Sequence, residues 1–248
     1  MTMNPQGKIA LITGGAHRVG KTITLALAQA GANVVVNHHT SSDAARETEA
    51  EARALGVGAL AVPADVADHA QVRAMVDTAV ARFGSIDILV NAASLFRQTP
   101  FPMTDVSPWE QVIAVSLHGS FYCANAIAPL MLQKGAGVIV NIADLMALEL
   151  RPHFAAHNVG KAALIALTRQ LAVDLAPTAC VNAVAPGLVL PPPNMSPERA
   201  AALAADTLLG RWGTPQDVAD AVLYLIRAEF VTGEVIVVDG GERFARYK

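Results

Sequence analysis

Short apolar runs alternate along this chain with longer stretches in which apolar residues recur at helical spacing. The first run, residues 8–12, leads through a short turn into a segment that is apolar every three or four positions as far as Ala30. A continuous apolar run suits a strand buried on both faces, and the spacing of the next segment suits an amphipathic helix. By this criterion we predict strands at residues 8–12, 33–37, 58–65, 86–94, 137–144, 179–187 and 233–241.

Helices are expected between these strands. We predict them at residues 19–30, 41–55, 68–84, 107–134 and 154–175, with two more that begin near residues 196 and 214. Two of the starts, Asp68 to Gln71 and Ser107 to Glu110, have the three-residue spacing of a capping box. Seven strands alternating with helices predict a single-domain α/β fold, a Rossmann-type doubly wound sheet of seven parallel strands with helices on both faces.

The chain of 248 residues, 53% of them hydrophobic, is long enough for one large core. We place a single domain at residues 1–248, with its core at about residues 8–244. The net charge is −3 and the basic residues are scattered, so we expect no nucleic-acid or membrane surface. Cys123 and Cys180 lie in apolar segments and are expected as free thiols, and the N-terminus lacks a signal-peptide pattern. A cytoplasmic location is therefore predicted.

Residues 13–20, Thr-Gly-Gly-Ala-His-Arg-Val-Gly, join the first strand to the first helix. Gly14 and Gly20 allow a tight turn and a close approach of the backbone to a ligand. The amide groups at the start of the helix and its dipole favour a pyrophosphate, so a dinucleotide is the expected ligand. The sequence resembles the short-chain dehydrogenase/reductase family, whose Thr-Gly-x-x-x-Gly-x-Gly motif it follows with Arg18 in place of the middle Gly. That variant is similar to the pteridine reductases, and the resemblance implies that Gly14, Arg18, Val19 and Gly20 surround the pyrophosphate.

The end of the second strand bears on the choice between NAD and NADP. An acidic residue there would bind the 2′-hydroxyl of NAD and repel a 2′-phosphate, and none is present. The polar residues His38, His39, Thr40 and Ser41 follow instead, and we expect them to receive the 2′-phosphate of NADP or NADPH. The alternative is a pair of solvated loop histidines. A metal site is not expected, because one nearby carboxylate and no cysteine accompany them.

The resemblance implies further cofactor contacts. In the family, the pair matched by Asp65 and Val66 receives the adenine ring, and the Asn-Asn-Ala-Gly segment is matched here by Asn91, Ala92, Ala93 and Ser94 in the form seen in pteridine reductases. The Pro-Gly pair close to the nicotinamide is matched by Pro186 and Gly187, followed by Leu188. The loop after it, up to the helix near residue 196, falls where the family has its substrate-covering lid.

Phe96 matches the pteridine reductase residue that stacks a pterin on the nicotinamide, and Arg18 is expected near both the pyrophosphate and the pterin. Without the resemblance, a loop Phe that fills a gap in the core would be the simpler interpretation. A flat aromatic substrate gains about 0.5–1.5 kcal/mol from such stacking beyond its area burial. The implied substrate is therefore a dihydropterin or dihydrofolate.

Asp144, His157 and Lys161 are the predicted catalytic residues. Asp144 follows the fifth strand where most of the family has a Ser, and pteridine reductases have Asp there. Thirteen residues on, His157 replaces the Tyr of the Tyr-x-x-x-Lys signature and Lys161 is kept. Residues four apart share one helix face, so His157 and Lys161 should point into one cleft. An ammonium beside an imidazolium disfavours the charged imidazole unless Asp144 compensates, and a helix cap is the alternative role for Asp144.

Ser116 occupies the position of the family's catalytic Asn, which makes the usual water relay doubtful. The implied function is an NADPH-dependent pteridine reductase, in which Asp144 and His157 relay the proton and Lys161 holds the ribose. Two alternatives stay open: an NADPH-dependent reductase of a non-pterin ketone or imine, and a paralogue that binds NADPH without turnover. The apolar small-residue helix at residues 162–173 and the last strand resemble the family's interfaces and imply a homotetramer.

Overall fold

The computed structural model describes residues 3–192 and 194–247. The ends of the predicted domain, residues 1–2 and 248, lie outside this range, as does residue 193 of the predicted lid loop. Its sheet has seven parallel strands in the order β3-β2-β1-β4-β5-β6-β7. The predicted Rossmann-type fold is confirmed. The strands are β1 (Ile9–Thr13), β2 (Asn33–His38), β3 (Ala59–Pro63), β4 (Ile88–Asn91), β5 (Gly137–Ile142), β6 (Ala179–Pro186) and β7 (Val235–Val238).

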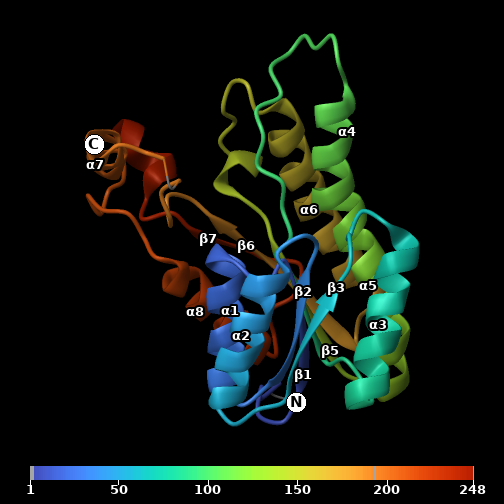
Figure 1. The fold of residues 1–248 in the computed structure, drawn as a ribbon. Helices are drawn as coiled ribbons and strands as arrows, with labels where there is room; N and C mark the ends of the chain where they lie inside the picture. The colour runs from blue at the N-terminus through green and yellow to red at the C-terminus, as the bar shows by residue number, and fades with distance from the viewer. Residues whose placement is uncertain (1–2, 193, 248) are drawn as a thin grey trace.

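Helices cover both faces of the sheet (Figure 1). One face is covered by α1 (Arg18–Gln29), α2 (Ser42–Ala54) and α8 (Pro215–Arg227), and the other by α3 (His69–Phe83), α5 (Gly119–Lys134) and α6 (Ala155–Asp174). The two larger hydrophobic clusters of the described residues lie one on each face, and the strands supply alternate residues to each. Helix α7 (Pro197–Ala205) and the short helical turn Glu242–Tyr247 lie together beyond the carboxyl end of β7 (Figure 1).

The predicted helix 107–134 is interrupted. It begins as α4 (Ser107–Ile113), passes through a π-helical turn at Ala114–His118 and continues as α5. The predicted capping box at its start is wrong, because Ser107 is itself the first helical residue and Asp105 accepts from its backbone N–H and hydroxyl. By length and composition the span 107–134 could cross a membrane, but α5 packs Cys123, Ile127 and Met131 into the core, as a buried helix does.

Side-chain caps explain where several other helices begin. Asp68 accepts from the N–H groups of Ala70 and Gln71. The second half of the predicted capping box there is absent, because the Gln71 side chain binds Asp65 N and the Asp68 carboxylate instead. A complete capping box forms at α8, where Thr214 and Asp217 bond reciprocally.

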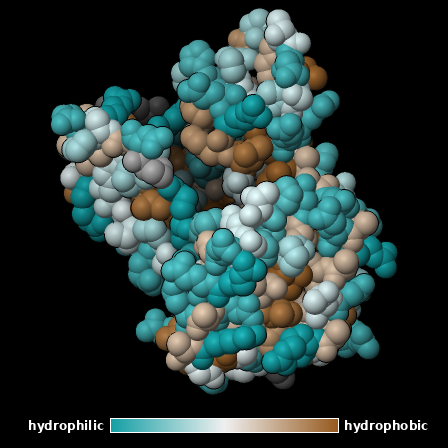
Figure 2. Space-filling view, viewed as in Figure 1, coloured by the Kyte–Doolittle hydropathy of each residue, from teal (hydrophilic) through white to brown (hydrophobic). Residues whose placement is uncertain are grey.

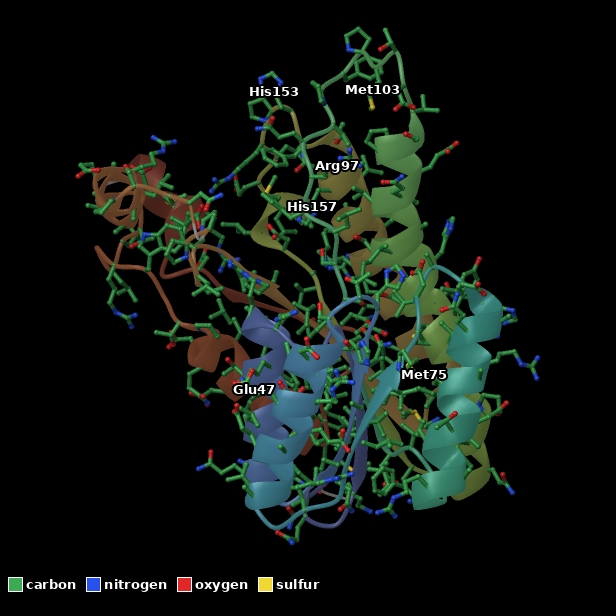
Figure 3. The ribbon with its side chains drawn as sticks, in the orientation of Figure 1. Glu47, Met75, Arg97, Met103, His153 and His157 are labelled. Atoms are coloured by element: carbon green, nitrogen blue, oxygen red, sulfur yellow. The ribbon has the colours of Figure 1, made fainter. Side chains whose placement is uncertain are left out.

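The segments that follow β4 and β5 project beyond the sheet together with α4 and the start of α6 (Figure 1). Thr99 links the two segments: its N–H donates to His153 O at 2.7 Å, and its hydroxyl accepts from Ala156 N at 2.9 Å. Met103 and His153 lie at the far end of this projection, and His157 lies nearer to the sheet (Figure 3). The projection forms one wall above the carboxyl ends of the strands.

Candidate active site

A cavity of about 910 Å³ opens at the carboxyl ends of β1, β2, β4, β5 and β6, where parallel sheets of this kind bind ligands. Figure 2 shows the surface hollowed between the projection and the segment that contains α7. Most of the predicted site residues line this cavity: Gly14, Arg18, Val19, Gly20, His39, Thr40, Ser41, Asp65, Val66, Ala92, Ala93, Ser94, Phe96, Asp144, His157, Lys161, Pro186 and Gly187. His38, Asn91 and Leu188 are not among the lining residues.

The turn after β1 needs its glycines. Gly14 has φ +61°, and a Cβ there would lie 2.9 Å from Ala93 Cα; a Cβ at Gly20 would lie 2.1 Å from Gly14 O. Arg18 has φ +49°, a backbone conformation that residues other than Gly rarely adopt, and it stands at the position where the family motif has Gly. Its guanidinium reaches across the cavity and Nη2 donates to Leu190 O at 3.2 Å. The turn therefore leaves no room for Cβ atoms at Gly14 and Gly20 and directs a cation over the cavity.

Thr13 and Asn91 hold the ends of β1 and β4 in place. The Thr13 hydroxyl accepts from the backbone N–H groups of Ala92 and Ala93, at 3.0 and 3.1 Å. Asn91 is buried and donates to Asn141 Oδ1 at 2.9 Å, and Asn141 donates in turn to Thr168. The side chain of Asn91 thus faces the interior, and its observed contacts support the cavity floor.

The end of β2 separates the two predicted histidines. β2 is one residue longer than predicted, and His38 pairs with Pro63 of β3. Since successive side chains point to opposite faces, Asn37 faces the glycine turn, where it accepts from Gly14 N, and His38 turns away from the cavity. His38 is 8% exposed, and burial, followed by the charges of Arg46 and His39, lowers its pKa. His39 extends into the cavity, with Nε2 4.0 Å from an Asp65 carboxylate oxygen.

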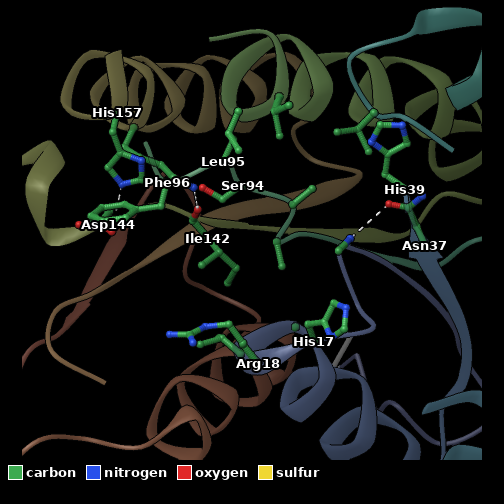
Figure 4. A pocket seen from close by; sticks show the side chains of 18 of the residues that line it. His17, Arg18, Asn37, His39, Ser94, Leu95, Phe96, Ile142, Asp144 and His157 are labelled. Atoms are coloured by element: carbon green, nitrogen blue, oxygen red, sulfur yellow. Dashed lines mark hydrogen bonds and ion pairs between the residues drawn. The ribbon is translucent and has the colours of Figure 1, made fainter. Parts of the chain in front are cut away.

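Asp144 and His157 meet at the opposite end of the cavity (Figure 4). Oδ2 of Asp144 lies 3.2 Å from Nε2 of His157, and Oδ1 accepts from Met146 N at 2.8 Å. Asp144 therefore also caps a helical turn at Leu145–Ala147, which was the alternative role for it. Both residues line the cavity, but the His157 side chain is 2% exposed and that of Asp144 is 29% exposed, so the carboxylate is the more open member of the pair.

Lys161 lies one helical turn after His157 and is buried. Its Nζ donates to Ile142 O at 2.7 Å, which fixes it beneath the end of β5. Burial lowers the pKa of Lys161 to about 8, and the negative charge of Asp144 partly opposes that shift. The site thus contains a buried ammonium that has given up much of its solvation and is available for hydroxyl groups of a ligand.

Aromatic rings close the outer side of the pair. Phe96 packs edge-on against the His157 ring with centroids 4.9 Å apart, and it stacks on Phe154 at 4.8 Å. It remains 59% exposed, so one part of the ring is available to a ligand. Nδ1 of His157 and Oγ of Ser116 are buried with no hydrogen-bond partner among the described residues. Ser116 lies in the π-helical turn, a form that often occurs at functional sites.

Glu242, after β7, connects two segments that border the reactive end. It forms an ion pair with Arg151, which lies in the segment between β5 and α6, and its Oε2 accepts from Leu188 N at 3.0 Å. Burial is the main cause that raises the pKa of Glu242. Leu188 contributes to the site through this backbone contact, although it does not line the cavity.

Some lining residues were not predicted from the sequence. These include His17, Leu95, Gln111, Val115 and Val189. His17 could have been identified, because it lies inside the glycine turn and is the helix N-cap position, but its side chain makes no capping bond. Figure 4 shows its ring at the same end of the cavity as His39.

The cavity suits a dinucleotide. The glycine turn provides a cradle that side chains would fill, Asp65 and Val66 form a shelf at one end, and the buried Lys161 lies at the other. No group of three or more His, Cys, Asp or Glu residues that could hold a metal ion occurs in the described part of the chain.

Comparisons with known proteins identify the family of this chain. Residues 14–242 match the family model described as enoyl-(acyl carrier protein) reductase. A 3-oxoacyl-[acyl-carrier-protein] reductase, FabG, of Staphylococcus aureus is 36% identical over 239 residues, which cover 94% of this chain and 97% of the relative. The reductase of that name from Synechocystis is 36% identical over 243 residues, covering 94% and 96%.

Solved structures give the same result. A 7α-hydroxysteroid dehydrogenase in complex with NADH and 7-oxo glycochenodeoxycholic acid superposes with a TM-score of 0.92 at 32% identity, covering 97% of this chain and 96% of the other. A gluconate 5-dehydrogenase from Burkholderia cenocepacia in complex with NADP and tartrate superposes with a TM-score of 0.90 at 34% identity, covering 98% of each. These relatives support the predicted family but not its pteridine reductase subfamily. The chain belongs to the short-chain dehydrogenase/reductase family of oxidoreductases.

Proposed function

We propose that the protein is an NADPH-dependent reductase of a carbonyl compound, the ketone alternative considered from the sequence. The observation that supports it is the contact of Asp144 with His157 beside the buried Lys161, in a cavity suited to a dinucleotide. Relatives at 36% identity are named as reductases of 3-oxoacyl groups, which are ketones. The nicotinamide cofactor, when bound, would supply the hydride.

Lys161 and the glycine turn would hold that cofactor. The Lys161 ammonium has one donor in use, to Ile142 O, and its other donors can bind the ribose hydroxyls next to the nicotinamide. Gly14 and Gly20 let the backbone approach the pyrophosphate.

The proton needed at the carbonyl oxygen would pass through the Asp144–His157 pair. The His157 side chain is 2% exposed and packs against Phe96, whereas the Asp144 side chain, at 29% exposed, is the more open of the two residues at the cavity. A proton held between Nε2 and Oδ2 can therefore move to the substrate oxygen from Oδ2, while His157 supplies it from behind. In this arrangement Asp144 contacts the substrate and His157 is a positioning residue that stores the proton.

A second candidate is reduction of a dihydropterin, the function implied by the sequence resemblance. The exposed part of Phe96, next to the Asp144–His157 pair, favours a flat aromatic substrate. The third possibility, a protein that binds NADPH without turnover, is consistent with the replacements at Ser116 and His157.

One experiment separates these functions. NADPH oxidation is followed at 340 nm with a 3-oxoacyl thioester, a simple cyclic ketone and a dihydropterin as substrates. We expect turnover of at least one ketone at a rate well above that with the dihydropterin. Faster turnover of the dihydropterin would replace our main proposal by the second candidate. Binding of NADPH with no turnover of any substrate by wild type, but turnover by His157→Tyr, would establish the third.

A further inference from the structure

Two buried polar atoms beside the reactive pair have no hydrogen-bond partner among the described residues. They are Nδ1 of His157 and Oγ of Ser116, in residues that are 2% and 0% exposed. Ser116 does not line the cavity, so a ligand bound there does not supply its partner. Leaving a buried donor or acceptor unpaired costs its desolvation free energy, so each atom indicates a partner that the protein chain alone does not provide.

The Ser116 hydroxyl is not used within its own helix. Serine and threonine hydroxyls inside helices can donate to the carbonyl oxygen four residues earlier, as they do here at Thr24, Thr48, Thr78, Ser120 and Thr168. Ser116 makes no such bond. It lies in the π-helical turn at Ala114–His118, where backbone bonds run to the fifth residue instead of the fourth. Its hydroxyl is therefore available to a neighbouring element.

That neighbouring element is α6, the helix that contains His157. A Cβ at Gly160 of α6 would lie 3.6 Å from Ser116 Cβ and 3.3 Å from Cδ1 of Ile113, so α6 passes close to the π-helical turn at this point. His157 comes one turn earlier on α6, and side chains three residues apart on a helix have Cβ atoms only about 5–6 Å apart. The two unpartnered atoms thus belong to neighbouring side chains, and one buried water is enough to bridge them.

The reactive pair determines what His157 needs at Nδ1. Nε2 of His157 lies 3.2 Å from Oδ2 of Asp144, and in the proposed function these two atoms share the proton that goes to the substrate. The imidazole can release its Nε2 proton and remain a neutral ring only if Nδ1 keeps a proton of its own. Nδ1 is then a buried N–H donor that requires an acceptor. A serine hydroxyl, like a water, can both accept and donate, so it can serve Nδ1 in either protonation state.

We propose that Ser116 is a positioning residue for this proton path: its Oγ binds Nδ1 of His157 through one buried water and so keeps a proton on Nδ1. The inference rests on the proposed function. During the transfer the Nε2–H bond breaks and an Oδ2–H bond forms on Asp144. That bond breaks in turn as the proton joins the carbonyl oxygen of the substrate, and solvent returns a proton to the pair at the more open Asp144 carboxylate. The Nδ1–H bond stays intact throughout.

A crystal structure that shows ordered water, together with NMR of the imidazole nitrogens, tests the contact without relying on activity. We expect a water within hydrogen-bonding distance of both Oγ of Ser116 and Nδ1 of His157. We also expect a proton on Nδ1 that exchanges slowly with solvent, in a signal assigned by its loss in His157→Phe. Ser116→Ala should lose both the water and the slow exchange.

Kinetics with the best ketone substrate test the role in the proton path. Ser116→Ala should lower kcat by about three- to tenfold, the effect expected for one net hydrogen bond, and leave the dissociation constant of NADPH unchanged. Ser116→Thr restores a hydroxyl and should regain the water and exceed Ser116→Ala in kcat. Ser120→Ala is the matched control, because it removes a similarly buried hydroxyl that is bonded to Ser116 O within the helix; it should behave as wild type.

Two results would overturn the inference. One is a structure in which no water joins Ser116 to His157, or in which Nδ1 carries no proton. The other is a Ser116→Ala variant whose kcat equals that of Ser120→Ala. If wild type reduces none of the substrates, the proposed function fails instead, and the crystal structure and NMR still decide whether Ser116 binds Nδ1.

Discussion

Asp144→Asn is the substitution that tests the proposed proton path most directly. The amide keeps the shape of the carboxylate and an oxygen that can accept from Met146 N, so the helical turn it caps should persist. It has no acidic proton to transfer from the position of Oδ2, the carboxylate oxygen that contacts His157. General acid catalysis contributes about 10²–10⁴-fold, so kcat should fall by at least about 10²-fold, equivalent to about 2.7 kcal/mol in the activation free energy.

The assay is steady-state NADPH oxidation with the best ketone substrate at pH 7.0. NADPH affinity should change little, because Lys161 and the glycine turn remain. His157→Phe should give a similar loss in kcat, since it removes the group that stores the proton. A variant Asp144→Asn that keeps more than about a third of the wild-type kcat would show that the proton comes from solvent or another group, and the assigned roles would be wrong.

Four further results are expected. Gly14→Ala should abolish measurable NADPH binding in a titration, because its Cβ would lie 2.9 Å from Ala93 Cα and φ is +61°; retained affinity would contradict the tight cradle. Lys161 has a pKa of about 8 in the folded protein, against an ordinary value of 10.5, so above pH 8 the unfolded chain binds more protons than the folded one. The free energy of unfolding, measured by urea denaturation, should therefore rise between about pH 8 and 10.5 in wild type but not in Lys161→Met. Asn141→Leu should destabilise the fold by about 1–3 kcal/mol because it removes the bond that Asn91 donates to Asn141 and the bond that Asn141 donates to Thr168, and an unchanged urea midpoint would count against that network. Light scattering should give a homotetramer, because the edge strand β7 and the exposed Val173 of α6 are open surfaces; a monomer near 26 kDa would refute this.

The strands and the reactive residues could be predicted from the sequence because the signals are local. The apolar runs are buried strands, and the spacing of His157 and Lys161 on one helix puts both at the cavity. Asp144 lies at the end of a parallel strand, and the carboxyl ends of parallel strands share the edge of the sheet where the cavity opens. Its contact with His157, which also lines that cavity, therefore followed from the topology.

Other features depended on context that the sequence pattern does not contain. β2 runs one residue further than its apolar run because His38 pairs with Pro63, and that extra residue decides which histidine faces the cavity. The π-helical turn at Ala114–His118 contains no Pro or Gly, the residues from which a break in the helix could have been predicted. The resemblance to pteridine reductases rests on Arg18, Phe96 and Asp144, which are three positions, whereas the comparisons weigh nearly the whole chain and do not support that subfamily.

The contacts of Glu242 with Arg151 and Leu188 allow a residue outside the cavity to affect the shape of its reactive end. Neither Glu242 nor Arg151 lines the cavity, yet together they brace two borders of it from outside. Substrate range could therefore drift in evolution, or be altered in the laboratory, through the segment after β7 while every residue that meets the ligand stays the same. A search for altered specificity in this enzyme would do well to randomise Glu242 before Phe96.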